Sequence, residues 1–308
     1  MQKLKFCNSL DIMKNKAIIA LFWFFFSSVY IVAQVIPAAE FSQSERIELR
    51  YPVILVHGIA RSDRGDRQAW GRIPTVLRES GIEVFYGYTD AWGDVASNAR
   101  LLKATVDNIL ATTNHERVNI IAHSKGGIDS RYFIWRYDYG DRVASLTTLS
   151  TPHGGSEIAD FLYQLRTQVR ILDNENLRRR LGNVGRLFGD LNPDFHNVNR
   201  DLTTENMERF NAMVTKDPRV FYQVIYSVMK DSGDDSMYSL SHAFIRNISG
   251  ENDGLVSAKS ARWGDNPIRL PISLSHRQMT DLGGDNGSSA IVLNIYLGIV
   301  RDLARKGF

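Results

Sequence analysis

The stretch Val118-Asn-Ile-Ile-Ala-His-Ser-Lys-Gly-Gly127 decides which fold we expect for this chain. Four of its first five residues are apolar, which predicts a strand, and the residues from 126 to about 137 predict a helix. Ser124 lies on the sharp turn between them, where a strained backbone tolerates only small residues two positions away. Ala122 and Gly126 satisfy this requirement. The pattern therefore indicates a nucleophile elbow with Ser124 as the nucleophile.

The segments around this turn alternate between apolar runs and helical periodicity. We expect strands at 51–56, 83–86, 118–122, 144–149 and 220–226, with a sixth at 243–248 or in a neighbouring segment. We expect helices at 71–80, 95–110, 126–137 and 289–305. This alternation predicts an α/β protein with a mostly parallel sheet of about six strands and helices on both faces.

Composition restricts the class of protein. The 308 residues are 44% hydrophobic and 23% charged, which excludes collagen, wholesale disorder and a multi-span membrane protein. The formal net charge of +3 comes from the first 33 residues, so the remainder is neutral and no nucleic-acid partner is expected. Cys7 is the single cysteine, which excludes an internal disulfide.

The N-terminus reads as a targeting segment. Lysines precede the apolar run from Ala17 to Phe26, and the small residue Ala33 lies near the end of the apolar segment, as in a secretory signal peptide. We therefore expect a signal peptide or membrane anchor at 1–33 and a single catalytic domain at 34–308. The protein would be secreted or periplasmic. The alternative is an uncleaved helix that anchors it to the outer face of the inner membrane, because the run through Ile36 is about 20 residues long.

A serine nucleophile needs a base, and the base needs an acid that orients it. After an elbow of this kind the acid precedes the histidine in the chain. Asp253 follows in the tight polar turn 250–256, and His276 lies on a loop before the final helix. We predict Ser124, Asp253 and His276 as the catalytic residues, with Glu251 or Asp281 as substitute acids.

The charge that develops on the substrate oxygen needs two backbone N–H donors. We expect one from Lys125, directly after the nucleophile, and the other from Ile59, in the loop that follows the first strand. Three other histidines have structural interpretations. His57 is expected to brace that loop, and His123 and His153 are expected to pack or form hydrogen bonds.

Four motifs resemble the secreted bacterial triacylglycerol lipases of the α/β-hydrolase fold. They are Tyr51-Pro-Val-Ile-Leu-Val-His-Gly58, the elbow 118–127, Thr151-Pro-His-Gly-Gly-Ser156 and Asn252-Asp-Gly-Leu-Val256. The resemblance implies the α/β-hydrolase fold, hydrolysis of long-chain esters, the triad Ser124–Asp253–His276 and oxyanion donors at Ile59 and Lys125. No cofactor is required for this chemistry.

Many relatives also hold a structural calcium beside the histidine loop. The resemblance places one ligand at Gln278, which is not a carboxylate, and another near Asp234 and Asp235. Asp281 is a possible substitute. A structural calcium is therefore a doubtful expectation for this chain.

The long insertion at about 157–203 is predicted to be a helical lid or cap. Apolar residues recur at helical spacing, and a group of arginines lies among them. These residues are Phe161, Leu162, Leu165, Val169, Leu172, Leu177, Leu181, Val184 and Phe188, with Arg166, Arg170, Arg178, Arg179, Arg180 and Arg186. A lid would expose its apolar face at a lipid–water interface, whereas a fixed cap would not move.

These features predict a serine hydrolase that cleaves carboxylic esters through an acyl-enzyme, most specifically a triacylglycerol lipase. The alternatives with the same site are a phospholipase, a short-chain carboxylesterase and a polyester depolymerase. A catalytically inactive domain that serves as a binding module is the alternative from another class. The expected partner is a lipid or another ester, at a lipid–water interface if the insertion is a lid. The sequence leaves the oligomeric state open.

Overall fold

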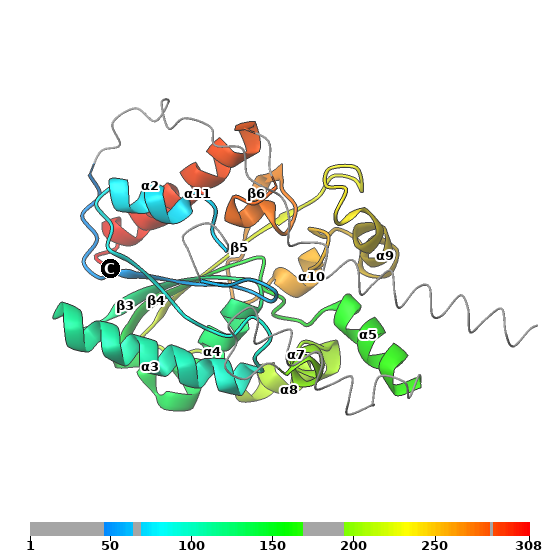
Figure 1. Ribbon diagram of the computed structural model, residues 1–308, viewed down its shortest axis with the longest axis horizontal. Coiled ribbons are helices and arrows are strands. Elements are labelled where there is room, and N and C mark those ends of the chain that lie inside the picture. Colours follow the sequence, from blue (N-terminus) through cyan, green and yellow to red (C-terminus); the bar gives the residue numbers. More distant parts are fainter. Residues whose placement is uncertain (1–45, 64–68, 169–193, 284–285) are drawn as a thin grey trace, which may run out of the picture. The chain divides into compact units, whose positions relative to one another are not determined.

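The central element is a six-stranded parallel sheet with strand order β2-β1-β3-β4-β5-β6. The computed structural model describes residues 46–63, 69–168, 194–283 and 286–308 (Figure 1). The strands are β1 (Val53–Val56), β2 (Val84–Tyr86), β3 (Val118–His123), β4 (Val143–Leu149), β5 (Phe221–Val228) and β6 (Ile268–Ser273). The first five confirm the strands predicted from the apolar runs.

Helices cover both faces of the sheet. Helices α2 (Ile73–Glu79) and α11 (Asn286–Arg305) lie on one face, and α3 (Val95–Thr113) and α4 (Lys125–Tyr137) lie on the other (Figure 1). Successive side chains of a strand point to opposite faces. Val53 and Leu55 accordingly join the core cluster of α2 and α11, whereas Ile54 and Val56 join the cluster of α3 and α4. Burial on both faces explains why β1 is continuously apolar.

Helix α11 is long and apolar enough to cross a membrane by composition alone. Its apolar residues are nevertheless part of the core, since Val292, Leu293, Tyr296 and Val300 are almost fully buried against the sheet and α2. The composition of α11 is therefore explained by its position in the core.

The prediction of a strand at 243–248 is wrong. This segment belongs to α9 (Ser239–Ser249), in which His242 and Ile245 are buried while Leu240 and Ile248 are exposed. A short apolar run does not distinguish a helix from a strand, and here the buried residues follow helical spacing. The sixth strand is the neighbouring β6, an edge strand whose exposed residues and Pro271 weaken the apolar signal.

The segment between β4 and β5 carries three described helices: α5 (Glu157–Gln168), α7 (Phe195–Asp201) and α8 (Thr204–Met213). Residues 169–193 lie outside the described residues, and so do residues 1–45. Most of the predicted lid, including Leu181 and five of its six arginines, and the predicted leader therefore remain predictions.

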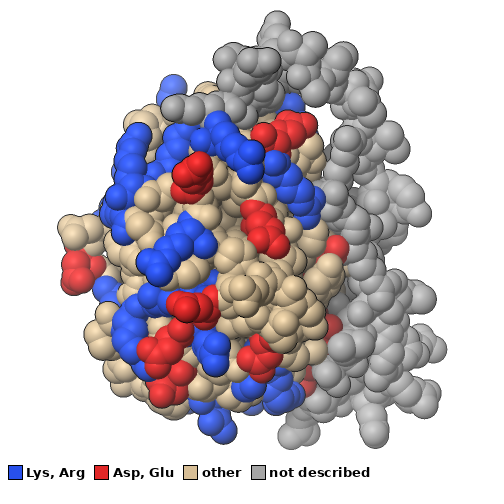
Figure 2. Space-filling model, turned by 90° about the vertical axis from the view of Figure 1, so that its left-hand side faces the viewer, with Lys and Arg blue, Asp and Glu red and all other residues tan. Residues whose placement is uncertain are grey.

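Short elements complete the described chain: α10 (Ala258–Ala261) and the 3-10 turns Tyr139–Asp141 and Gln278–Thr280. Figure 2 shows one side of the molecule, on which basic and acidic side chains both occur across the surface. Exposed ion pairs of the described residues include Lys103 with Asp107 and Arg269 with Glu251.

Candidate active site

Ser124 lies between β3 and α4 with strained backbone angles, φ 55° and ψ −132°. Its N–H donates to the carbonyl oxygen of Leu149 at 2.9 Å, which ties the turn to β4. A Cβ atom at Gly126 would lie 2.4 Å from the carbonyl oxygen of Val56, so only glycine fits there. The neighbouring sheet therefore imposes the small residue that the elbow motif requires.

Three side chains form a continuous hydrogen-bonded chain that begins at this serine. His276 Nε2 lies 2.9 Å from Ser124 Oγ, and His276 Nδ1 lies 2.8 Å from Asp253 Oδ2. The residues follow the C-terminal ends of different strands: Ser124 comes after β3 and His276 after β6. The turn with Asp253 is held against the end of β5 by a bond from Met229 N–H to the carbonyl oxygen of Asn252 (2.8 Å). The tertiary structure thus brings together three residues that are far apart in the sequence.

The geometry around Asp253 fixes the direction of its carboxylate. Oδ1 accepts hydrogen bonds from the N–H groups of Leu255 (3.0 Å) and Val256 (2.8 Å), which leaves Oδ2 facing the histidine. His276 N–H also donates to the Asp253 carbonyl oxygen at 2.8 Å. The carboxylate is buried, and both of its oxygens form hydrogen bonds, as expected for an acid that orients an imidazole.

The substitute acids lie elsewhere. The Glu251 carboxylate is exposed and pairs with Arg269 at 2.7 Å, and the pairing lowers the Glu251 pKa. The Asp281 carboxylate pairs with Arg72 Nε at 3.0 Å. Of the three acids considered from the sequence, Asp253 is the one that bonds to His276.

The predicted oxyanion donors, Ile59 and Lys125, flank Ser124. A Cβ atom at Gly58 would lie 2.6 Å from the Cβ of Ser124, so the loop that carries Ile59 passes directly over the serine. Lys125 is the first residue of α4, and its N–H therefore has no acceptor within the helix. Both N–H groups belong to backbone segments that adjoin Ser124.

The bracing interpretation of His57 agrees with its contacts. Its Nδ1 lies 2.8 Å from the carbonyl oxygen of Gly58, and its Nε2 lies 3.0 Å from that of Thr89. The ring therefore connects the loop after β1 to the loop after β2, beside the position of Ile59.

The Lys125 side chain takes part in a buried cluster that the sequence analysis missed. Its Nζ lies 2.6 and 2.9 Å from the two carboxylate oxygens of Asp129, and the Asn98 amide donates to Asp129 at 2.9 Å. All three side chains are buried behind the elbow. The available signal was the spacing of Lys125 and Asp129, four residues apart on a predicted helix. A charged pair with this spacing usually lies on the surface, so the spacing did not indicate a buried cluster.

His153 belongs to a second buried cluster. A guanidinium only donates, so His153 Nδ1 accepts from Arg131 Nη1 (3.1 Å) and Nε2 donates to Thr148 Oγ1 (3.0 Å). Burial, together with Arg131, holds the His153 pKa well below 6.5, and burial lowers the Arg131 pKa to about 9. His153 therefore has a packing and hydrogen-bonding position.

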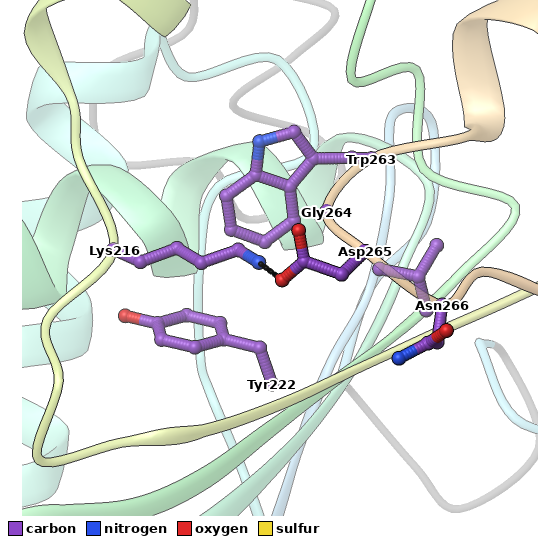
Figure 3. A pocket seen from close by; sticks show the side chains of 7 residues that line it. Lys216, Tyr222, Trp263, Gly264, Asp265 and Asn266 are labelled. Atoms are coloured by element: carbon purple, nitrogen blue, oxygen red, sulfur yellow. Dashed lines mark hydrogen bonds and ion pairs between the residues drawn. The ribbon is translucent and has the colours of Figure 1, made fainter.

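A separate shallow hollow is lined by Lys216, Tyr222, Val224, Trp263, Gly264, Asp265 and Asn266 (Figure 3). Lys216 Nζ lies 3.3 Å from Asp265 Oδ2, and the Asp265 side chain is almost fully exposed. None of the predicted site residues lines this hollow.

Comparisons with known proteins point to one group of enzymes, although no family model matches the chain. A triacylglycerol lipase of Pseudarthrobacter phenanthrenivorans is 35% identical over 175 residues, which is 53% of this chain and 53% of that protein. Triacylglycerol lipase 2 of Saccharomyces cerevisiae is 29% identical over 261 residues, 78% of this chain and 74% of that protein. The chain thus spans about half the length of the first of these relatives.

The similarity to solved structures concerns the fold. A metagenomic carboxyl esterase superposes with a TM-score of 0.66 at 16% identity, covering 90% of this chain and 82% of that one. Together with the six-stranded parallel sheet and the elbow at Ser124, this shows that the chain has the α/β-hydrolase fold and resembles bacterial triacylglycerol lipases in sequence.

Proposed function

We propose that this protein is a serine hydrolase that cleaves carboxylic esters. The observation that supports this most strongly is the hydrogen-bonded chain from Ser124 Oγ through His276 to Asp253, with the serine on a strained elbow. The hydroxyl, the imidazole and the carboxylate have the relative placement that nucleophile, base and orienting acid require.

In the proposed reaction, Ser124 Oγ attacks the ester carbonyl while His276 Nε2 takes its proton. Asp253 accepts from Nδ1–H and stabilises the imidazolium, and the N–H groups of Ile59 and Lys125 bind the oxyanion. His276 then gives its proton to the departing alkoxide, which leaves as the alcohol. Water, deprotonated by the same histidine, attacks the acyl-enzyme; the acid leaves and Ser124 regains its proton.

For the substrate we propose triacylglycerols. The sequence relatives are named triacylglycerol lipases, and an apolar surface next to the site supports an interfacial substrate. Leu240 (82% exposed) and Ile248 (58%) lie on α9, and Phe161 (38%) on α5 stacks edge-to-face on Phe244 with 5.4 Å between the centroids. Exposed apolar side chains that cluster in this way are typical of a surface that binds lipid or a partner.

This apolar surface lies close to the catalytic histidine. Tyr238 directly precedes α9, and its ring lies edge-on to the His276 ring with the centroids 6.5 Å apart. A lipid surface that contacts α5 and α9 would therefore deliver its ester to the neighbourhood of Ser124.

We propose further that residues 1–33 direct the protein out of the cytoplasm, by a cleaved signal peptide or an uncleaved anchor. Sequencing the N-terminus of the protein recovered from the medium, the periplasm and the membranes tests this proposal. Recovery of the full-length protein in the cytoplasm would contradict both forms.

The reaction and the substrate need separate experiments. A fluorophosphonate should label the wild-type protein covalently and leave the Ser124→Ala variant unlabelled. Folded wild-type protein that stays unlabelled would instead support the inactive binding module.

Rates on esters of increasing acyl length, and on emulsified triacylglycerol against phospholipid vesicles, then identify the substrate. The lipase proposal predicts the highest rate on long-chain triacylglycerol. A maximum on short soluble esters would indicate a carboxylesterase, and a maximum on the vesicles would indicate a phospholipase.

A further inference from the structure

The loop that carries His276 is held by two arginine–carboxylate pairs. Ser275 and Arg277, the two neighbours of His276, both bind the carboxylate of Asp235. Ser275 Oγ and Arg277 Nε each donate to Oδ2 at 2.7 Å, and Arg277 Nη2 donates to Oδ1 at 2.8 Å. Four residues beyond Arg277, Asp281 accepts from Arg72 N–H (2.8 Å) and Arg72 Nε (3.0 Å).

These contacts do not fit the calcium ion that the resemblance suggests. Asp235 carries an additional bond from Met237 N–H at 3.0 Å, so both of its oxygens already have donors. Asp234 Oδ2 accepts from Lys230 N–H at 2.7 Å and from Ser273 Oγ at 2.6 Å. Calcium needs six to eight oxygen ligands around one point. The described residues contain no group of three or more carboxylate, histidine or cysteine side chains that would surround a metal ion.

The Arg277–Asp235 pair is built into the structure. The side chains are 14% and 1% exposed, and the guanidinium binds both carboxylate oxygens. A Cβ atom at Gly283 would lie 2.3 Å from Arg277 Cζ, so the chain passes closely over the guanidinium at a residue with φ +70°. Bidentate pairs of this kind combine charge with a fixed geometry.

We propose that Arg277 is a positioning residue for His276, and that its pair with Asp235 performs the task that a calcium ion would otherwise have. Asp235 precedes α9, the segment that leads to Asp253, whereas Arg277 adjoins His276. The pair therefore joins the segment that carries the acid to the loop that carries the base. This inference rests on the proposed ester hydrolysis, and it implies that hydrolysis does not depend on calcium.

The test compares the rate of fluorophosphonate labelling and kcat for a soluble ester across a set of variants, with and without a chelator. Wild-type rates should change less than about twofold when EDTA or millimolar calcium is added. Arg277→Ala should lower kcat and the labelling rate about 10- to 100-fold, the range seen when a group that orients a ligand is lost, with KM nearly unchanged. Arg277→Lys should lower kcat and the labelling rate less than Arg277→Ala, because lysine keeps the positive charge but not the bidentate geometry.

The matched control is Arg269→Ala. It removes an exposed bidentate pair with Glu251 on the edge strand and should change kcat less than about twofold.

Asp235→Ala should lower kcat about as much as Arg277→Ala, and the variant that combines both changes should lower kcat little further. The low-field proton resonance of the His276–Asp253 hydrogen bond should broaden or shift in Arg277→Ala and not in Arg269→Ala. A purely structural role would leave that resonance unchanged in folded protein.

Three results would overturn the inference: loss of wild-type labelling in EDTA with recovery in calcium, wild-type rates in Arg277→Ala, and an unchanged resonance in that variant. If Arg277→Ala does not fold, the Arg277→Lys variant and the chelator experiment test the inference in its place. Absence of labelling in folded wild-type protein at any calcium concentration would contradict the proposed function instead. The two failures are therefore distinguishable.

Discussion

His123 Nε2 lies 3.0 Å from the carbonyl oxygen of His276, and the centroids of the two imidazole rings are 4.6 Å apart. A carbonyl oxygen only accepts, so His123 donates from Nε2. Burial, together with the nearby His276, holds the His123 pKa well below 6.5, so the ring is neutral. His123, which directly precedes Ser124, therefore holds the backbone of His276, whose ring contacts Ser124.

The dependence of stability on pH should reveal this buried histidine. His123 and His153 are neutral in the folded protein and become protonated on unfolding below about pH 6.5, so the unfolded state binds more protons there. Their contribution to stability is present above pH 6.5 and is lost as the pH falls, by about 1.4 kcal/mol per pH unit for each proton. Denaturant unfolding between pH 5 and pH 8 measures this slope. His123→Asn should reduce it by about one proton, and an unchanged slope would contradict the assignment.

The catalytic residues should act as a unit. Ser124→Ala and His276→Ala should each lower kcat by about five to six orders of magnitude, and the double variant should lose little more, because neither group works without the other. Steady-state kinetics on a soluble ester, with circular dichroism to verify folding, provides the measurement. Losses that multiply in the double variant would show that His276 does not serve Ser124.

Asp253→Asn should lower kcat by about 10⁴, because the amide stabilises the wrong imidazole tautomer. Glu251→Gln should leave kcat within about twofold, because Glu251 is exposed and pairs with Arg269. The same ester assay compares the two variants. Near wild-type activity in Asp253→Asn would assign the acid to another residue.

The strained backbone of Ser124 should appear as a difference between two inactive variants. At φ 55° glycine fits and alanine is strained, so Ser124→Gly should be more stable than Ser124→Ala by about 1 kcal/mol, or about 2 °C in Tm. Ser130, in the interior of α4, is the control. There the glycine variant should be the less stable of the two. The same order at both positions would contradict strain at Ser124.

The apolar surface of α5 and α9 should matter for emulsions and not for dissolved esters. Leu240→Asp should lower the rate on emulsified triacylglycerol about 30-fold, since burying a leucine side chain in lipid contributes about 2 kcal/mol. The same change should leave kcat/KM for a soluble short-chain ester within about twofold. Ile268→Asp is the matched control, because Ile268 is 44% exposed at the first residue of β6, whereas His276 follows the other end of that strand. An equal loss of activity on the emulsion and on the soluble ester would indicate a disturbed active site or fold and would contradict lipid contact by Leu240.

The sequence by itself determined the parallel sheet, five of its six strands and the elbow at Ser124. These features depend on local signals: apolar runs that mark doubly buried strands, and small residues that the turn requires on steric grounds. The order of acid and base along the chain also made Asp253 and His276 the first candidates, with Glu251 and Asp281 left open as substitute acids. Local patterns were insufficient at 243–248, where a short apolar run fits a strand or a helix and the segment is part of the helix α9.

Only the tertiary structure decided which acid reaches His276 and what holds the histidine loop. Glu251, Asp253 and Asp281 are equivalent as residue types, and their distances to His276 follow from how the ends of β5 and β6 pack together. In the same way, Arg277 and Asp235 are 42 residues apart, and no spacing rule joins them. Contacts between residues far apart in the chain depend on burial and charge pairing across the whole domain. A sequence pattern reflects only the conformational preferences of residues close together in the chain.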